Sequence, residues 1–306
     1  MREAAVTLSQ GGGFQAYYTQ NGDGSLNLDK LSSMADVAVF ARARQKYCHH
    51  SVSVPQVAVL LSTYDYQHRN LPGNPGALFP NFTGGATGIM NCLLENQYSV
   101  DLLGESSLLP DMNRFPLIVI PECETLSEVF RDDLLEYVRG GGSLLVVGKT
   151  MTEFFSASLR QSQESGWFSV PFGAGKIGFI PEEIAGDYES RRGAKDIRAK
   201  VKVFVDELFP EPQVKVVSSP YVDVSLRKLN GKLQVHLVNT SGDHRNTAII
   251  DSIDPVKDIE VSVCCTEKPS RIVCQPDGKE LKFKYKDGKA IFKLPVLEIY
   301  DIIEIE

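Results

Sequence analysis

The chain has 306 residues, of which 42% are hydrophobic, and it carries 32 Lys and Arg against 39 Asp and Glu, a formal net charge of −7. This length suits about two domains of ~150 residues, each with a packed core. The acidic balance and the lack of a basic stripe argue against a nucleic acid or a membrane surface as partner, and no apolar run approaches the ~20 residues of a membrane span.

The first 53 residues predict one strand and one helix. Residues 4–8 form a short apolar run, and residues 29–47 carry apolar side chains at helical spacing. One strand and one helix cannot bury their apolar faces alone. We therefore expect residues 1–53 to belong to a larger body.

Residues 54–212 alternate between apolar runs and helical patterns. The runs predict four strands buried on both faces of a parallel sheet, at residues 56–61, 100–103, 117–120 and 144–147. Helical patterns cover residues 86–94, 126–139 and 197–208, and a long polar loop covers residues 62–83. Thr125 and Glu128 have the spacing of a capping box. These patterns predict a doubly wound α/β domain.

Residues 213–306 lack helical spacing. Val222, Val224 and Leu226 alternate with polar residues, and Asn230-Gly231 is a strong hairpin signal. We expect an antiparallel β-sandwich of ~90 residues.

The segment from Gly173 to Gly178 has the spelling of a dinucleotide-binding loop, G-x-G-x-x-G. Such a loop follows a buried strand and opens a helix, so that backbone amides meet the pyrophosphate. Here residues 167–172 make a poor parallel strand, and Pro181 soon follows. We therefore predict a hairpin or a loop, and no nucleotide cofactor.

Cys123 follows the third predicted strand, where amidotransferase-type folds can hold a nucleophile. It stands between Glu122 and Glu124, whose charges would raise the pKa of the thiol, and no downstream His-x-Glu pair is present to activate it. The sequence therefore predicts no catalytic cysteine.

The remaining histidines and cysteines do not predict a metal site. None of the six cysteines forms a CxxC pair, and His49 and His50 are adjacent, so they cannot share one helical face. His236 lies in an alternating strand, where we expect it to face outward or to be satisfied by a neighbour.

The polar segment at residues 64–70 follows the first strand, at the carboxyl edge where open α/β sheets usually bind ligands. Its aromatic residues, mixed with amide and hydroxyl groups, suit sugar recognition through stacking and hydrogen bonds, and Tyr64, His68 and Arg69 are candidate substrate-binding residues. The alternative is a solvated connecting loop.

Several segments together resemble the C-terminal half of certain glycoside hydrolases. They are GGGFQAYYTQNGDG, RARQKYCHHSVSVPQVAVLLS, YVRGGGSLLVVG, LQVHLVNTSGDHR and PVLEIYDIIEIE. Their order is similar to that in beta-galactosidases with an amidotransferase-like trimerisation domain and in related fucosidase-like proteins of Bacteroidetes. The resemblance covers nearly the whole chain.

This resemblance implies three regions. Residues 1–53 would be the last strand and helix of a TIM-type barrel, residues 54–212 a flavodoxin-like or class I amidotransferase-like domain, and residues 213–306 the C-terminal β-sandwich. Both catalytic carboxylates of such enzymes lie on barrel strands, and a full barrel takes ~250 residues. The chain would therefore hold no catalytic residue. It would serve oligomerisation and border an active site.

The same resemblance suggests sugar contacts and partners. Gln15, Tyr17 and Tyr18 would stand just past the end of a barrel strand and touch a sugar in the complete parent. The partners would be a carbohydrate, reached through that parent, and further copies of the chain or a barrel domain. The N-terminus lacks the apolar core of a signal peptide, and the bacterial relatives imply the cytoplasm or the periplasm.

Two other functions stay open from the sequence. The chain would act as a stand-alone carbohydrate-binding module if residues 64–70 and 79–83 formed the site. It would act as a cysteine amidotransferase or hydrolase if Cys123 were a reactive thiol.

Overall fold

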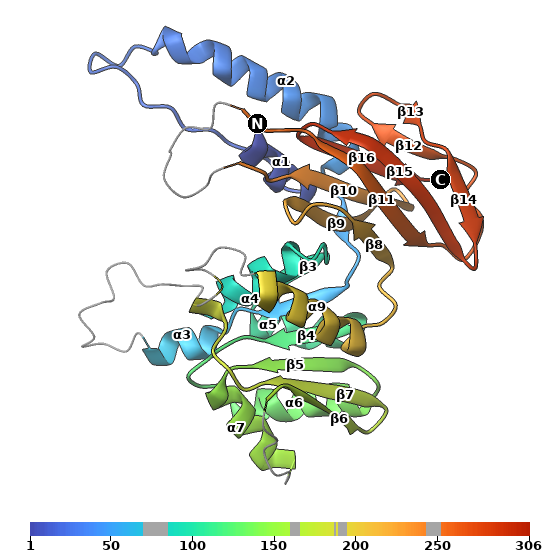
Figure 1. Ribbon diagram of the computed structural model, residues 1–306. Coiled ribbons are helices and arrows are strands. Elements are labelled where there is room, and N and C mark those ends of the chain that lie inside the picture. Colours follow the sequence, from blue (N-terminus) through green and yellow to red (C-terminus); the bar gives the residue numbers. More distant parts are fainter. Residues whose placement is uncertain (70–84, 160–165, 187, 189–194, 243–251) are drawn as a thin grey trace. The chain divides into compact units, whose positions relative to one another are not determined.

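The computed structural model describes residues 1–69, 85–159, 166–186, 188, 195–242 and 252–306. The chain divides into two compact units (Figure 1). The α/β unit comprises Pro55–Pro212. The β-rich unit combines Met1–Val54 with Gln213–Glu306. The fold class is mixed α/β, with one sheet that contains parallel strands and two antiparallel sheets.

The α/β unit is built on a six-stranded sheet. Its order is β3 (Val100–Leu103), β2 (Val57–Leu60), β4 (Leu117–Ile120), β5 (Ser143–Val147), β7 (Gly175–Ile180) and β6 (Phe168–Phe172). The four strands predicted from apolar runs are confirmed, and they are parallel to one another. The predicted hairpin is also confirmed, because β6 pairs with β7 in antiparallel fashion. The sequence missed that β7 runs parallel to β5 and so extends the parallel sheet.

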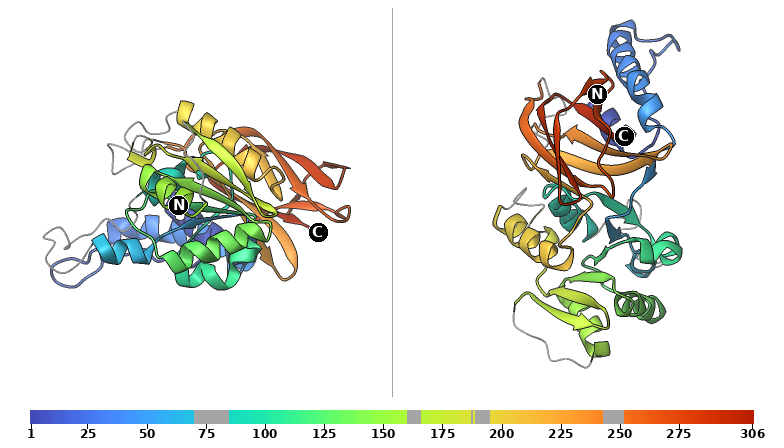
Figure 2. Two further views of the ribbon diagram at one scale, coloured as in Figure 1. Left: turned by 90° about the horizontal axis from the view of Figure 1, so that it is seen from below. Right: turned by 90° about the vertical axis from the view of Figure 1, so that its right-hand side faces the viewer.

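Helices cover both faces of this sheet (Figure 2). Alternate residues of β2 enter different cores: Val57 and Val59 pack with α4 (Ala86–Leu94) and α9 (Lys195–Leu208). Ala58 and Leu60 pack with α6 (Glu128–Arg139) and α7 (Lys149–Leu159). A strand buried on both faces explains why its sequence is continuously apolar. Two short helices, α5 (Glu105–Leu108) and η2 (Leu109–Arg114), follow β3.

Two predictions about this unit were wrong. The start of the expected loop is a helix, α3 (Thr63–Arg69). Helix α6 is capped by Ser127, whose side chain accepts a hydrogen bond from the amide of Phe130, and not by Thr125. The amide of Thr125 is held by a carboxylate from α3, so Thr125 belongs to the loop before the helix.

The β-rich unit contains two antiparallel sheets. The first has the order β1 (Val52–Ser53), β9 (Val222–Leu229), β10 (Lys232–Asn239), β16 (Tyr300–Ile305), β12 (Ile272–Gln275) and β13 (Lys279–Glu280). The second has the order β14 (Phe283–Lys286), β15 (Lys289–Leu297), β11 (Val256–Cys264) and β8 (Val214–Val217). Val224 and Val235 from the first sheet share one core with Val261 and Phe292 from the second.

The N-terminal segment corrects a further prediction. Residues 4–8 are not a strand but part of helix α1 (Arg2–Ser9). Ala5 and Leu8 lie on one helical face and pack against Val238 and Ile302 of the first antiparallel sheet. A short apolar run is compatible with either a strand or a buried helix. Here the segment is a helix that buries the apolar surface of the first antiparallel sheet. The second predicted helix is confirmed as α2 (Leu31–Cys48), which follows η1 (Leu28–Lys30).

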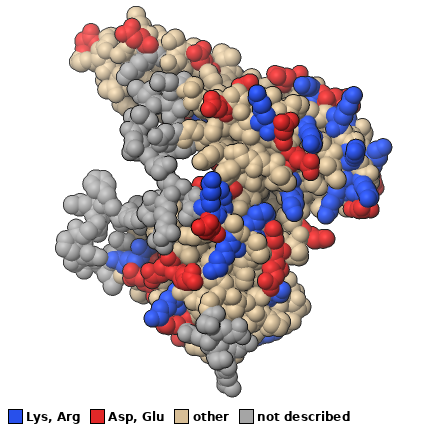
Figure 3. Space-filling view, in the orientation of Figure 1, with Lys and Arg blue, Asp and Glu red and all other residues tan. Residues whose placement is uncertain are grey.

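Charged side chains of both signs are mixed on the face of the molecule seen in Figure 3. Lysines are dense on β14, which ends its sheet and exposes Lys284 and Lys286. Charged side chains on an edge strand discourage pairing with another chain. None of the helices in the described part of the chain has the length and hydropathy needed to cross a membrane.

Candidate functional site

The carboxyl edge of the parallel sheet is where ligands bind in open α/β folds, at the point where the strand order reverses. Here the chain leaves β2 for β3 on one side and then crosses to β4 on the other. The candidate site therefore lies among the segments that follow β2, β3 and β4. Three carboxylates of the protein itself hold backbone amides along this edge.

Glu105, directly after β3, holds the start of α3. Its Oε2 accepts hydrogen bonds from the amide and the hydroxyl of Thr63 at 2.9 and 2.7 Å, and its Oε1 accepts from the hydroxyl of Ser62 and the amide of Tyr64. Burial alone would raise the pKa of Glu105, but the hydrogen bonds from Ser62 and Thr63 outweigh it and lower that pKa. The start of α3 therefore has two acceptors: the hydroxyl of Ser62, which accepts from the amide of Asp65 at 3.0 Å as a local N-cap, and the carboxylate of Glu105 from a distant segment.

Asp65, on α3, holds the loop that follows β4. Its side chain is buried, and Oδ1 accepts the amides of Glu124 and Thr125 at 2.9 and 3.1 Å. Its Oδ2 accepts from Nε of Arg69 at 2.8 Å. One carboxylate therefore joins the segments on both sides of the strand-order reversal.

Glu122 makes the third connection. Its Oε1 accepts the amides of Ile184 and Ala185, the latter at 2.7 Å. Two glycines make room for this side chain, because an added Cβ at Gly85 would meet the Cβ of Glu122 at 2.5 Å, and one at Gly148 would lie 3.0 Å from its Cγ. The approach of three chain segments at this point needs residues without side chains.

Backbone amides at the carboxyl edge are the groups that hold phosphates in nucleotide-binding α/β folds. In this protein Glu105, Asp65 and Glu122 already occupy three pairs of them. An anionic ligand would have to displace one of these carboxylates, and it would also be repelled by its negative charge. The arrangement disfavours nucleotide binding at this edge.

Cys123 lies beside these carboxylates, in surroundings that disfavour its thiolate form. Burial, with further contributions from Asp65, Glu105 and Glu122, raises the pKa of the thiol to about 12. The sequence correctly predicted the direction of this shift from the flanking glutamates, but burial is the largest cause. A thiol that stays protonated near neutral pH is a poor nucleophile.

The glycines of the G-x-G-x-x-G segment serve packing. An added Cβ at Gly175 would lie 2.1 Å from the carbonyl oxygen of Gly142, and one at Gly178 would lie 2.7 Å from Cδ1 of Leu208. Gly175 lets the backbone of β7 approach that of Gly142, and Gly178 lets α9 pack on β7. The segment opens no helix, because β6 and β7 form a hairpin there.

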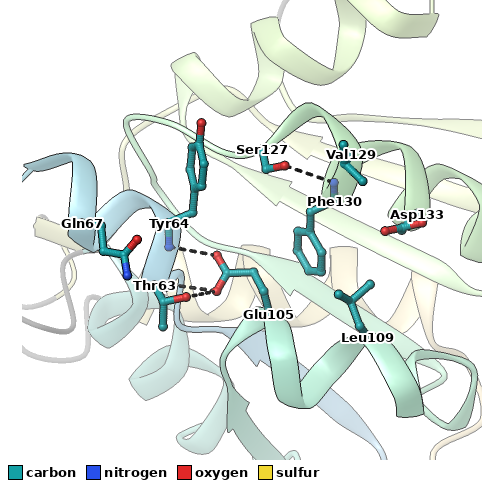
Figure 4. A pocket seen from close by; sticks show the side chains of 9 residues that line it. All are labelled: Thr63, Tyr64, Gln67, Glu105, Leu109, Ser127, Val129, Phe130 and Asp133. Carbon is teal, nitrogen blue, oxygen red and sulfur yellow. Dashed lines mark hydrogen bonds between the residues drawn. The ribbon is translucent and has the colours of Figure 1, made fainter.

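A pocket of about 270 Å³ opens where α3, α5, η2 and α6 meet (Figure 4). Nine residues line it: Thr63, Tyr64, Gln67, Glu105, Leu109, Ser127, Val129, Phe130 and Asp133. Of the three candidates from residues 64–70, only Tyr64 lines this pocket. His68 stacks on Tyr64 with a ring-centroid distance of 4.2 Å, and Arg69 is engaged by Asp65.

The other candidate residues lie outside this pocket. Gln15, Tyr17 and Tyr18 belong to the irregular segment between α1 and η1, and Tyr17 is 88% exposed. This segment follows a helix, not the strand expected, and sugar contact by these residues stays a prediction. Residues 79–83 lie outside the described part of the chain.

Sequence reasoning missed the carboxylate that organises the site. Glu105 comes directly after the second predicted strand, so the rule that pointed to residues 64–70 would also have pointed to it. Asp133 and Val129 gave no such signal, because they sit on a helix where a polar or small side chain is ordinary.

His236 is completely buried, with Nδ1 2.6 Å from the hydroxyl of Tyr300 and Nε2 3.3 Å from Oε1 of Gln234. The sequence allowed an outward or a satisfied histidine, and the second is confirmed. Burial, with Arg227 nearby, lowers the pKa of His236 to about 3. Among the described residues no group of three His, Cys, Asp or Glu side chains is placed to hold a metal ion.

No protein-family model matches the chain, and no curated protein matches its sequence. Solved structures do match its fold. Alpha-L-fucosidase isoenzyme 2 from Paenibacillus thiaminolyticus matches with a TM-score of 0.75 and 15% identity, over 99% of this chain and 56% of that chain. A catalytic mutant of Gan42B, a GH42 beta-galactosidase from G. stearothermophilus, matches with a TM-score of 0.57 and 13% identity, over 93% and 45%.

A beta-galactosidase from Bacillus circulans sp. alkalophilus matches similarly, with a TM-score of 0.56 and 12% identity, over 93% of this chain and 46% of that chain. The chain thus spans about half the length of the solved structures that it matches. Identities this low establish a common fold and leave activity open. The resemblance seen in the sequence is confirmed at this level: the chain has the fold of a part of alpha-L-fucosidase and GH42 beta-galactosidase chains.

Proposed function

We propose that the chain is a non-catalytic, C-terminal portion of a glycoside hydrolase related to beta-galactosidases or fucosidases, and that it serves oligomerisation and borders the active site. The observation that carries this proposal is the match over 99% of the chain to about half of an alpha-L-fucosidase. The carboxyl edge supports a structural role for the α/β unit, because Glu105, Asp65 and Glu122 occupy its amides.

The finer fold assignments are part of this proposal. The parallel strand order β3-β2-β4-β5-β7 supports a flavodoxin-like or class I amidotransferase-like domain. The core shared by the two antiparallel sheets supports a β-sandwich. The amidotransferase activity itself is not proposed, because burial and nearby carboxylates hold the thiol of Cys123 protonated.

Exposed apolar side chains in the N-terminal segment suggest where a further body docks. Leu26, Leu28 and Val39 are 65%, 72% and 69% exposed, and Cys48 is the only residue of α2 that is buried among those whose side chains the structure describes. Contiguous exposed apolar patches mark interaction sites, and we propose that these three side chains contribute to one. The occupant that we propose is the rest of a barrel, in the parent or in a separate chain.

The test has a catalytic and an assembly arm. The purified chain should not hydrolyse nitrophenyl β-galactoside or nitrophenyl α-fucoside, and it should self-associate or bind a separately produced barrel domain in light-scattering measurements. Val39→Asp should abolish assembly through α2. Val203→Asp is the matched control, because Val203 is 73% exposed on α9 of the other unit.

Turnover that survives removal of contaminants would refute the non-catalytic role. A chain that stays monomeric alone and with the barrel would refute the assembly role. Equal effects of the two aspartate substitutions would show that α2 is not the surface involved.

A further inference from the structure

The pocket between α3 and α6 contains three polar side chains, those of Tyr64, Gln67 and Asp133, whose hydrogen-bonding atoms have no partner among the described residues. The carboxylate of Glu105 is saturated, because each of its oxygens accepts two hydrogen bonds from the protein. The side chains of Asp133 and Gln67, in contrast, have no hydrogen-bond or ion-pair partner among the described residues. Figure 4 shows these two at opposite ends of the pocket.

Between these ends apolar side chains lie beside the saturated carboxylate of Glu105. Phe130 is only 4% exposed and forms part of the hydrophobic core, and its ring lies between Glu105 and Leu109 in Figure 4. Leu109 and Val129 flank it, with 43% and 73% of their surfaces exposed. Apolar walls with a few polar groups at fixed positions are the usual composition of a small-molecule site.

The charge of the lining disfavours anionic ligands. Glu105 and Asp133 are acidic, and none of the nine lining residues is Lys, Arg or His. An anion would be repelled by both carboxylates without meeting a cation. Asp133 offers only acceptors while Gln67 offers both a donor and an acceptor, so vicinal hydroxyl groups, which donate and accept, match them well.

We propose that this pocket binds a neutral sugar, with hydroxyl groups on Asp133 and Gln67 and the carbon face of a sugar ring on Leu109 and Val129. The site belongs to the α/β unit by itself and does not depend on the proposed role in a glycoside hydrolase. The pocket is open to solvent, so much of a bound sugar stays hydrated. The dissociation constant should therefore be on the order of 1 mM.

Saturation-transfer NMR on the intact chain provides the test, with lactose and 2′-fucosyllactose as neutral probes and 3′-sialyllactose as the anionic probe. The neutral sugars should bind, and the anionic sugar should bind at least about fivefold more weakly. Asp133→Ala and Gln67→Ala should each weaken neutral binding about fivefold, which corresponds to about 1 kcal/mol.

Asp132→Ala is the matched control, because Asp132 is adjacent on α6 but pairs with Arg131 and does not line the pocket. All three variants should keep the urea midpoint of the wild type, so that a loss of binding reports on the site. Absence of saturation transfer at sugar concentrations well above the expected dissociation constant would overturn the proposal. So would equal binding by Asp133→Ala and Asp132→Ala, or equal binding of the anionic probe. Sugar binding is measured here without turnover or assembly. A negative result would therefore refute this site and leave the proposed function untouched.

Discussion

Asp65 reaches the backbone amide of Thr125 at 3.1 Å, across 60 residues of sequence. Through this bond and its neighbour to Glu124, the helix after β2 is tied to the loop after β4. The edge of the sheet that would bind a ligand in a nucleotide-binding fold is thereby closed by a carboxylate. The α/β unit therefore keeps the architecture of a ligand-binding domain, while the backbone amides of Glu124 and Thr125 at its carboxyl edge are bound by the protein's own carboxylate.

Replacing Asp65 should destabilise the α/β unit strongly. Asp65→Ala leaves two amides and Arg69 without their acceptor, and we expect a loss of about 3 kcal/mol in the free energy of unfolding. Asp65→Asn keeps one acceptor oxygen and should lose less. Urea denaturation followed by circular dichroism measures both. Asp132→Ala serves as the exposed control, and a loss for Asp65→Ala no larger than the control's would contradict this account.

Glu105 should make stability depend on pH in the acidic range. Its pKa is lowered in the folded chain, so its contribution is fully present above the unfolded pKa and is lost as pH falls through the folded value. The stability difference between wild type and Glu105→Gln should therefore shrink between about pH 5 and pH 3. Urea midpoints across that range give the result. A difference that stays constant with pH would show that the charge of Glu105 is unimportant.

His236 should be neutral and protonated on Nε2. Gln234 donates through Nε2 to Glu304, so its Oε1 faces His236, which must donate from its own Nε2 and accept from Tyr300 at Nδ1. Long-range nitrogen–proton NMR correlations identify the tautomer directly. Tyr300→Phe removes the donor to Nδ1 and should cost about 1–3 kcal/mol. A signal from the Nδ1-protonated form would refute this hydrogen-bond order.

The same histidine should weaken the fold at mildly acidic pH. Because its folded pKa is about 3, below that of an unfolded histidine, the unfolded chain binds a proton that the folded chain refuses. The stability contribution of neutral His236 is lost as pH falls from about 6.5 toward 3. His236→Asn should flatten the slope of unfolding free energy in this window. An unchanged slope would mean that other groups cause it.

Cys123 should react slowly with iodoacetamide in the folded chain. Its pKa near 12 leaves little thiolate at neutral pH. Mass spectrometry after short labelling at pH 7.5 should find Cys123 modified far more slowly than in the same chain unfolded in urea. Labelling of Cys123 ahead of the other five thiols would revive a cysteine nucleophile.

Gly175→Ala should destabilise the sheet. The added Cβ would lie 2.1 Å from the carbonyl oxygen of Gly142 and 2.4 Å from that of Val138, and backbone atoms cannot move aside cheaply. We expect a loss of about 2 kcal/mol or more. Gly186→Ala is the control, because an added Cβ there meets nothing within 4 Å. Equal unfolding free energies for the two variants would contradict the close approach.

The sequence alone determined the α/β sheet and the strand-rich second region. Continuous apolar runs such as residues 117–120 mark strands buried on both faces, and the Asn230-Gly231 turn follows from the left-handed backbone that both residues adopt. Helix α9 and the buried face of α6 were also readable, because Phe130, Leu134 and Val138 recur at helical spacing. In each case the pattern is long or rests on local backbone preference.

Tertiary structure decided what short segments became. Residues 4–8 form a helix because they cover a sheet whose strands lie more than two hundred residues away, and Glu105 adds a distant carboxylate to the local cap that Ser62 gives α3. The site itself arises in the same way, since Asp65, Glu105 and Glu122 act on amides distant in sequence. Hydrogen bonds between remote segments depend on where the fold places their donors and acceptors, and neither composition nor periodicity encodes that placement.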